Sequence, residues 1–256
     1  LYGVTSESRI LQICSPSFDP SVLDWAMAGY AGAELVITPP TIYGGAELRA
    51  LIQQTGVTHA TITPAVLGSV DPAGLDSLQS LNVGGDVSTT ELVARWAPGR
   101  RFFNAYGPTE TTIVSTRALL DASGPSTIGG PTAGVQALVL DGRLRPVPAG
   151  VSGELYLAGD ALARGYHRRA ALTSDRVGAN PFGAPGTRMY RTGDVVRWDD
   201  QRRLVFAGRS DFQVKVRGFR IELGEIDAAL QTHSLVDFAT TVGHDMPSGQ
   251  TALVSY

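Results

Sequence analysis

Ala33-Glu34-Leu35-Val36-Ile37-Thr38 begins the stretch that decides the fold of this chain, and His59-Ala60-Thr61-Ile62-Thr63 ends it. Both are short runs rich in β-branched and apolar residues, which indicates strands. Between them, the segment Gly45 to Gln54 carries apolar residues at helical spacing, namely Leu48, Leu51 and Ile52. A strand, a helix and a second strand in succession predict a parallel sheet with helices packed on it.

From about Thr127 the sequence changes character, because closely spaced glycines and prolines separate short strand-like runs. These runs are Gln136 to Leu140, Glu154 to Ala158 and Arg203 to Ala207, and Asp141-Gly142 is typical of a hairpin turn. The pattern predicts a more antiparallel, barrel-like subdomain, and the segment beyond Asp211 opens a third, smaller unit. We therefore expect an α/β protein with a parallel-rich sheet subdomain over 1–126, a barrel-like β subdomain over 127–211, and the start of a small C-terminal unit over 212–256.

The composition is ordinary for a globular protein and disfavours several other classes. The chain has 256 residues, of which 43% are hydrophobic and 18% are charged, and its formal net charge is −3. This balance offers no basic stripe for nucleic acid, and the apolar stretches are too short to span a membrane. The single cysteine, Cys14, excludes an intramolecular disulfide and a multi-cysteine zinc site, and we interpret it as a small buried apolar residue. With no leader-like start, we expect a cytoplasmic protein and an internal segment of a longer chain.

The run Asn104-Ala105-Tyr106-Gly107-Pro108-Thr109-Glu110 combines the groups that a nucleotide site needs. A Gly-Pro turn exposes backbone N–H groups and the ring of Tyr106 can stack on a base. Thr109 can donate to a phosphate oxygen, and Glu110 can hold Mg²⁺. The same run is also ordinary helix-entry chemistry, with Thr109 as the cap and Glu110 in the first turn. Taken alone, the run leaves both interpretations open.

Further polar, glycine-punctuated blocks accompany this run in a fixed order. They are Phe18-Asp19-Pro20-Ser21 upstream and, downstream, Gly153 to Gly159 with Leu162 to Tyr166, Tyr190-Arg191-Thr192-Gly193-Asp194, Gly208-Arg209-Ser210-Asp211, and Gln213 to Asp227. Together these blocks resemble the adenylation domains of nonribosomal peptide synthetases, within the superfamily of acyl-adenylate-forming, AMP-binding ligases. The resemblance covers nearly the whole chain. It implies a large core of sheets and a distorted barrel, joined by a hinge to a small α+β C-terminal domain.

The resemblance implies an enzyme that joins an amino-acid carboxylate to the α-phosphate of ATP, releases pyrophosphate, and passes the aminoacyl group to the phosphopantetheine thiol of a carrier protein. ATP and Mg²⁺ are then the cofactors, since positive charge must offset the repulsion between carboxylate and polyphosphate. The implied partners are an amino acid and a peptidyl carrier domain, with a condensation domain and a small accessory protein as further candidates. Two alternatives stay open: an acyl- or aryl-CoA ligase of the same superfamily, and a non-catalytic module that docks a carrier protein.

The resemblance gives roles to residues of the first run. Thr109 and Glu110 are the expected catalytic residues, with Thr109 at the α-phosphate and Glu110 as the Mg²⁺ ligand. Tyr106 and Gly107 belong to the nucleotide site, and Tyr106 stacks near adenine.

Two later residues match contacts to the ribose. Asp194 matches a carboxylate whose two oxygens can accept from both ribose hydroxyls, and Arg209 matches a second ribose contact. Each has an ordinary alternative, since Thr192-Gly193-Asp194 is a common turn and Arg209 with Asp211 is a candidate surface ion pair. Asp211 also matches the junction of the large and small domains, so the resemblance makes it the hinge.

The segment Gln213 to Arg220 alternates and carries Lys215, Arg217 and Arg220. One interpretation is an exposed strand whose charges protect a sheet edge. The resemblance implies instead that this strand swings in during thioester formation, and that Gly218 leaves room in a tunnel for the narrow pantetheine arm.

Asp19 decides between branches of the superfamily. It matches the aspartate that pairs with the α-amino group of the substrate, and a ligase for fatty or aryl acids would bind no cation there. A buried unpaired carboxylate is costly, so Asp19 implies an amine. The run Arg220 to Ile226 also looks more like peptide synthetases than like acyl-CoA ligases. The alternative is that Asp19 is the N-cap of a helix that begins near Ser21.

By position within the matched motifs, the side-chain pocket is expected to be lined by Asp19, Pro20, Leu23, Thr61, Asn82, Gly84, Ala105, Ile113 and Val114. Gly84 and Ala105 are small and leave room, and Asp19 carries the only charge in these walls. A charged substrate side chain would go unpaired, so we expect a neutral amino acid of medium to large size, with aromatic ones included. Thr61 and Asn82 can each supply one hydrogen bond to an indole, phenol or amide.

Two elements of the resembled family do not occur in these 256 residues. One is a Gly- and Ser/Thr-rich phosphate loop that ends in Pro-Lys-Gly, expected upstream of Phe18. The other is the adenylation lysine near the end of the small domain, because Lys215, the only lysine, matches a different motif. We therefore expect that this chain alone does not form the adenylate.

Overall fold

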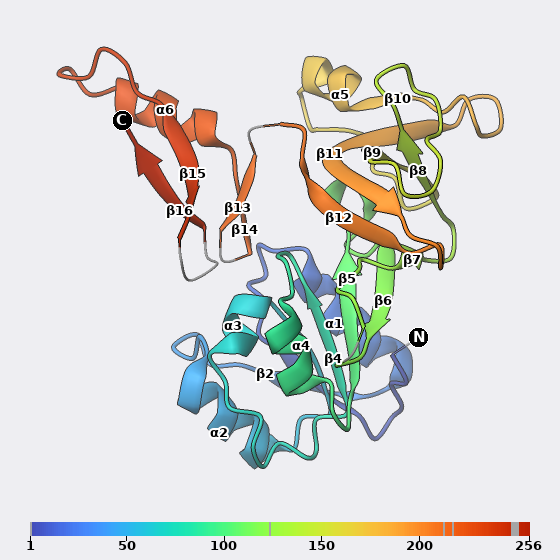
Figure 1. Cartoon of the computed structure of the whole chain (residues 1–256). Coiled ribbons are helices and arrows are strands. Elements are labelled where there is room, and N and C mark those ends of the chain that lie inside the picture. Colours follow the sequence, from blue (N-terminus) through green and yellow to red (C-terminus); the bar gives the residue numbers. More distant parts are fainter. Residues whose placement is uncertain (1, 123, 212, 217, 247–250) are drawn as a thin grey trace.

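Two sheets account for most of the described chain, and a small C-terminal unit follows them (Figure 1). The computed structural model describes residues 2–122, 124–211, 213–216, 218–246 and 251–256. The first sheet has seven strands in the order β2-β1-β3-β4-β5-β6-β7. These strands are β1 (Arg9–Gln12), β2 (Glu34–Ile37), β3 (His59–Ile62), β4 (Ser80–Gly84), β5 (Arg101–Tyr106), β6 (Thr116–Leu120) and β7 (Gly130–Pro131). Its helices are α1 (Pro20–Ala31), α2 (Gly45–Thr55), α3 (Pro64–Gly68) and α4 (Thr90–Trp96).

The predicted strand, helix and strand form β2, α2 and β3, and the parallel sheet is confirmed. Strands β1 to β5 run parallel, whereas β6 and β7 pair antiparallel at one edge. Helix α2 buries Leu48 and Ile52 and ends at Gly56, whose left-handed backbone (φ 63°) favours glycine. In the sheet, β1 lies between β2 and β3, so the strand order changes direction at β1.

The two faces of this sheet differ in polarity. Helices α2, α3 and α4 cover one face, and α1 packs on the other (Figure 1). Ile62 and Leu81 point into the core beneath α2 to α4. Because side chains alternate along a strand, Thr61 and Asn82 point to the opposite face, where both are buried.

The second sheet is antiparallel and has five strands, β8 (Val135–Leu140), β9 (Gly153–Gly159), β10 (Val177–Ala179), β11 (Arg188–Trp198) and β12 (Leu204–Arg209). Strand β11 pairs with β10 through its first half and with β12 through its second, and the pairing register shifts between Val195 and Val196. The sheet therefore curls, as predicted for a barrel-like subdomain. Helix α5 (Ala170–Arg176) lies beside β10. At Asp141 the chain makes the predicted turn, with Leu144 donating to the Asp141 carbonyl.

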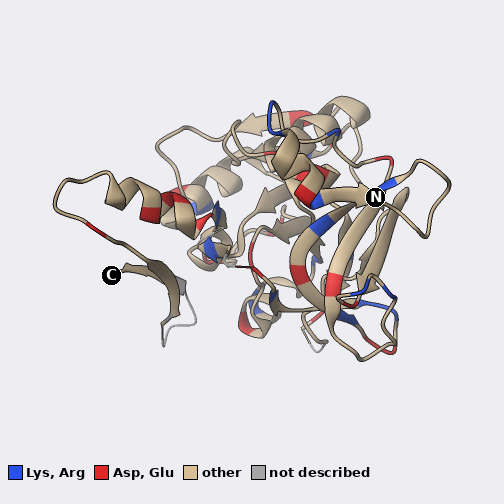
Figure 2. Ribbon diagram, turned by 90° about the horizontal axis from the view of Figure 1, so that it is seen from above, with Lys and Arg blue, Asp and Glu red and all other residues tan. Residues whose placement is uncertain are grey.

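The C-terminal unit contains β13 (Val214–Val216), β14 (Phe219–Ile221), α6 (Leu223–Gln231), β15 (Thr241–Asp245) and β16 (Thr251–Ser255). Strand β7 still pairs in the first sheet, so the change of sheet lies between Pro131 and Val135. The boundaries at 126 and 211 stay predictions. Among the described residues, no helix combines the length and the apolar character needed to cross a bilayer. Figure 2 shows basic and acidic residues interleaved along the described ribbon.

We expect the core of the first sheet to be sensitive to loss of volume at β4. Leu81 is fully buried on the central strand, so Leu81→Ala should lower the free energy of unfolding by about 2–5 kcal/mol. Leu119 on β6 is 65% exposed, so Leu119→Ala should change the free energy of unfolding by less than about 0.5 kcal/mol. Urea unfolding of both variants measures the difference. Equal effects would contradict the placement of the core.

Candidate active site

One cavity lies at the carboxyl ends of the parallel strands β3, β4 and β5, next to the point where the strand order changes direction. Such crevices are the usual ligand sites of open α/β sheets. The cavity collects residues that the sequence places far apart: Asp19, Pro20, Leu23, Thr61, Asn82, Gly84, Ala105, Tyr106, Gly107, Thr109, Ile113, Val114, Asp194, Arg209 and Gly218. Of the expected site residues, Glu110 and Asp211 are outside this lining. They lie beside it, because each pairs with an arginine that lines the cavity.

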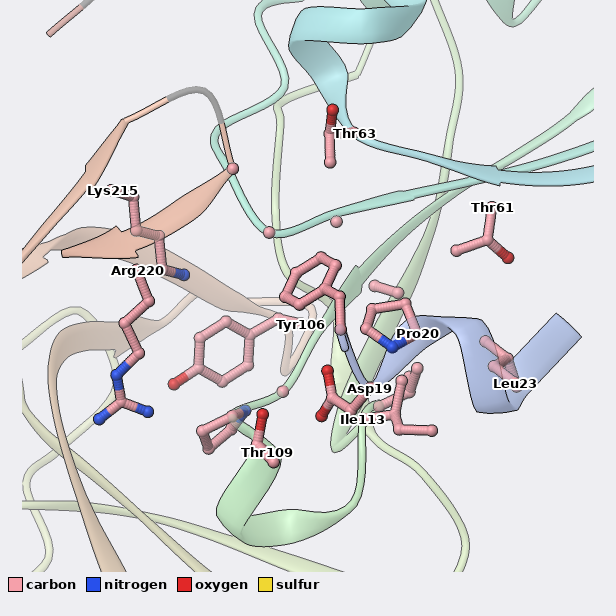
Figure 3. A pocket seen from close by; sticks show the side chains of 18 of the residues that line it. Asp19, Pro20, Leu23, Thr61, Thr63, Tyr106, Thr109, Ile113, Lys215 and Arg220 are labelled. Atoms are coloured by element: carbon pink, nitrogen blue, oxygen red, sulfur yellow. The ribbon is translucent and has the colours of Figure 1, made fainter. Parts of the chain in front are cut away.

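Asp19 occupies the N-cap position of α1, but its side chain makes no capping hydrogen bond. The helix-cap alternative is therefore right about the position of Asp19, but its side chain does not cap the helix. Its Oδ2 atom is buried without a hydrogen-bond partner. Burial raises the pKa of Asp19, and the nearby Thr109 hydroxyl opposes that rise. Figure 3 shows the Asp19 carboxylate beside Thr109, at the centre of the cavity.

The loop after β5 is held in an unusual backbone conformation. A 3₁₀ turn spans Thr109–Thr111 with Pro108 in the capping position, so Thr109 does not cap a helix. Thr112 (φ 59°) and Ile113 (φ 66°) follow in left-handed conformations, which β-branched residues rarely adopt. At Gly107 an added Cβ would lie 2.3 Å from the carbonyl oxygen of Ile113. The tight loop presents Ile113 and Val114 to the cavity.

Glu110 already has partners from two distant segments. The hydroxyl of Tyr166 donates to Oε1 (2.6 Å), and Nη1 of Arg220 lies 3.0 Å from both carboxylate oxygens. Burial raises the pKa of Glu110, but the Tyr166 hydrogen bond and the Arg220 charge outweigh it and hold the pKa below its usual value. Among the described residues, no cluster of three or more His, Cys, Asp or Glu side chains surrounds this carboxylate.

Arg209 is the centre of a buried ionic network. Its Nη1 donates to Asp194 Oδ1 (2.5 Å), and its Nε and Nη2 donate to the two oxygens of Asp211 (2.7 and 2.9 Å). The Tyr106 hydroxyl donates to Asp194 Oδ2. Arg209 and Asp211 do pair, but their side chains are 11% and 23% exposed, so the surface-pair interpretation is wrong. Both oxygens of Asp194 are engaged, and only their second lone pairs remain for a ligand.

Strands β13 and β14 pair only with each other among the described residues, and parts of this hairpin pack against the core. The Nζ atom of Lys215 lies 5.6 Å from the ring centre of Tyr106, and burial lowers the pKa of Lys215. Gly218 has a left-handed backbone (φ 84°), and an added Cβ would lie 2.9 Å from Thr63. Figure 3 shows Lys215 and Arg220 on the side of Tyr106 away from Thr61. Arg217 lies outside the described residues.

The sequence did not reveal that Tyr166 and Arg220 are partners of Glu110. It also did not reveal a second buried carboxylate, that of Asp24. The side chain of Asp24 is fully buried on α1, and neither of its oxygens has a hydrogen-bond partner. Burial raises its pKa to about 8, which the Thr61 hydroxyl partly opposes. A signal was present, because Ser21, Asp24 and Ala28 recur on one helix face and all three are buried.

Cys14 is half-buried, and its Sγ lies 3.7 Å from the carbonyl oxygen of Thr61. Burial, with Asp24 and Asp19 nearby, raises the pKa of its thiol to about 12. The thiolate is therefore suppressed, which agrees with the interpretation of Cys14 as a non-catalytic residue.

Comparison with known proteins identifies the relatives of this chain. The profile of a family described as "AMP-binding enzyme" matches residues 2–167. A probable non-canonical nonribosomal peptide synthetase of Salinispora arenicola, CymA, is 47% identical over 99% of the chain, and a linear gramicidin synthase polypeptide of Brevibacillus parabrevis is 45% identical over all of it. The chain spans 3% and 5% of these two relatives. A solved structure of a holo nonribosomal peptide synthetase protein with adenylation and PCP domains, bound to a vinylsulfonamide inhibitor, matches with a TM-score of 0.90 and 29% identity, over 99% of this chain and 46% of that one.

Gly107 should not tolerate a side chain. Because a Cβ would lie 2.3 Å from the carbonyl oxygen of Ile113 and 2.7 Å from the Ser115 nitrogen, Gly107→Ala must displace the loop. We expect it to lower the free energy of unfolding by about 1–3 kcal/mol. Gly142→Ala is the control, since a Cβ there meets nothing within 4 Å. Thermal unfolding of the two variants tests this; an unchanged midpoint for Gly107→Ala would contradict the loop geometry.

Asp24 should destabilise the fold at neutral pH. Its pKa of about 8 in the folded state lies above that of an unfolded aspartate, about 3.9. Stability from this group is therefore fully present below pH 4 and falls as the pH rises toward 8. Asp24→Asn removes this dependence, so the variant should be more stable than wild type by on the order of 2–4 kcal/mol at pH 8, and nearly equal at pH 4.5. Urea unfolding at both pH values checks the sign; a gain that is larger at pH 4.5 would contradict it.

Proposed function

The chain belongs to the AMP-binding enzyme family, and on that premise we propose that it is the amino-acid-activating part of a nonribosomal peptide synthetase. One observation carries the proposal: a single cavity holds an unpartnered carboxylate oxygen of Asp19 at its centre and the Tyr106, Asp194 and Arg209 group on one side. The Asp19 oxygen suits the ammonium group of an amino acid, and the group of Tyr106, Asp194 and Arg209 suits a nucleoside. The reaction joins the amino-acid carboxylate to the α-phosphate of ATP and releases pyrophosphate.

Asp19 and Thr109 fix the reacting carboxylate in this proposal. A buried carboxylate without a partner needs a cation, and the substrate ammonium supplies it. In this proposal the carboxylate of the same amino acid points toward Thr109, which lies beside Asp19 and would donate to a phosphate oxygen. Orientation of two anions at close range is the main contribution that the protein can make to such a step.

The residues at Glu110 fit a magnesium ion that is shared with a polyphosphate. Mg²⁺ in such sites usually takes one or two carboxylates together with substrate phosphates, and Glu110 is a single carboxylate beside the cavity. When bound, the ion would supply positive charge at the phosphates. Both Glu110 oxygens face Arg220 in this structure, so Arg220 must give up that position to a metal.

Transfer to a carrier protein is the second half of the proposal. Arg220 and Gly218 both lie beyond Asp211, so a rotation there would move them together, which supports the assignment of Asp211 as the hinge. In this structure Gly218 packs so closely on Thr63 that an added Cβ would lie 2.9 Å from it, so a pantetheine arm could pass Gly218 only after the two residues move apart. A peptidyl carrier domain, a condensation domain, an accessory protein and a cytoplasmic location belong to the same proposal.

Removal of the Asp19 charge tests the function. We measure amino-acid-dependent ATP–pyrophosphate exchange on a polypeptide in which this chain is extended by a phosphate loop and a lysine segment of the family. Breaking a buried ion pair costs about 3–5 kcal/mol, so Asp19→Asn should lower kcat/KM roughly 100- to 1000-fold or more. The exposed Asp76→Asn is the matched control.

Three results would separate the alternatives. Exchange with neutral amino acids that depends on Asp19 supports the proposal. Exchange with acids that lack an amine, unaffected by Asp19→Asn, would indicate an acyl- or aryl-CoA ligase. No exchange with either class would favour a module that only docks a carrier protein.

A further inference from the structure

The inner wall of the cavity carries hydrogen-bonding atoms that the protein does not use. Thr61 and Asn82 line the cavity and are 6% and 4% exposed. Within the described residues, Thr61 Oγ1 and Asn82 Oδ1 are buried and have no hydrogen-bond partner. Buried polar atoms are nearly always paired, and leaving one unpaired is costly. These two atoms therefore point to a ligand that completes them.

The sheet sets these two side chains next to each other. Thr61 on β3 and Asn82 on β4 are register partners in parallel strands, which are about 4.8 Å apart. Beyond them, Gly84 on β4 pairs with Ala105 on β5, and a Cβ on Gly84 would lie 2.6 Å from the Ala105 carbonyl oxygen. Small residues thus leave the space in front of Thr61 and Asn82 to the ligand.

Asp24 does not line the cavity; it is fully buried on α1 near Thr61, whose hydroxyl lowers the pKa of Asp24. As a hydroxyl oxygen, Thr61 Oγ1 can accept a hydrogen bond from a ligand in the cavity. The pKa of Asp24, about 8, keeps this acid neutral at pH 7. The wall then presents two acceptors, Thr61 Oγ1 and Asn82 Oδ1, and no negative charge beside them.

Resting on the proposed function, we propose that the pocket selects a neutral amino acid whose side chain ends in a primary carboxamide. The two N–H groups of the carboxamide donate to Thr61 and Asn82. A hydrocarbon side chain of the same shape would leave both acceptors buried and unpaired, and sites built around hydrogen bonds discriminate strongly against such analogues. A cationic side chain would lose its hydration with no charged partner.

The test compares isosteric ligands on the full 256-residue chain. The probes are non-hydrolysable sulfamoyl-adenosine analogues of two pairs of amino acids: asparagine with leucine, and glutamine with its hydrocarbon isostere 2-amino-5-methylhexanoic acid. Calorimetry gives the affinity of each analogue. In at least one pair the carboxamide should bind about tenfold to 100-fold more tightly than the hydrocarbon.

Variants test the assigned residues through the ratio of the two affinities, which a general loss of stability would not change. Asn82→Leu and Thr61→Val each remove one acceptor and should bring the ratio close to one. Ser80→Ala is the matched control, because Ser80 is a buried polar residue of the same strand but does not line the cavity.

The outcomes separate this inference from the proposed function. Equal or tighter binding of both hydrocarbon analogues by the wild-type chain would overturn the carboxamide assignment and leave amino-acid activation in place. Tighter binding of an ornithine or lysine analogue would overturn the neutral class. A carboxamide preference that survives Asn82→Leu and Thr61→Val would overturn the residues assigned. If no aminoacyl analogue binds this chain, the carboxamide assignment is overturned, and pyrophosphate exchange by the extended polypeptide then decides whether the proposed function fails as well.

Discussion

The bridge that Arg209 makes between Asp194 and Asp211 is the interaction on which the arrangement of the site depends. Asp194 lies on β11 and Asp211 follows β12, so one guanidinium ties two strands of the curled sheet to the start of the C-terminal unit. Gly193 makes this possible, because a Cβ there would lie 2.5 Å from Asp211 Oδ2. Through the hydroxyl of Tyr106, the same network reaches β5 of the first sheet. Removing the guanidinium would leave the buried carboxylate of Asp194 without its arginine, whereas Asp211 would keep Arg176 at 3.3 Å. Losing a buried partner is far more costly than losing a surface pair.

The second constraint is the difference between the two faces of the first sheet. A parallel sheet that is covered on both faces usually has strands that are apolar throughout. Here β3 and β4 alternate, and their polar residues, among them Thr61 and Asn82, are buried on the face that carries α1. The core beneath α2 to α4 supplies the stability, so the other face can hold polar groups that a folded core alone would not need. The unused hydrogen-bonding capacity of the cavity is a consequence of this division.

Local pattern was enough to predict part of this molecule from its sequence. Helix α2 and strands β2 and β3 follow from periodicity, and the turn at Asp141 follows from its residue types. The motif resemblance placed Asp19 and Thr109 in one site, although their roles stay proposals. Pairing between distant segments could not be predicted, because nothing local links Glu110 to Arg220, 110 positions away. Asp24 was missed for another reason: a carboxylate on an apolar helix face signals burial, but only the packed structure shows that it has no partner.

The charge of Glu110 connects the position of the C-terminal unit with metal binding. The Glu110 side chain is 11% exposed, and a carboxylate so little hydrated needs a positive partner. In this structure Arg220 on β14 is that partner, so the unit beyond Asp211 is held against the core by the same charge that the proposed function gives to Mg²⁺. A metal ion held by Glu110 would compete with Arg220 for this carboxylate. Each therefore weakens the binding of the other by the same factor, since such coupling is reciprocal. On the proposed function, a metal at Glu110 and the docked position of Gly218 at the cavity would therefore disfavour one another, and Glu110 is the residue that would connect them.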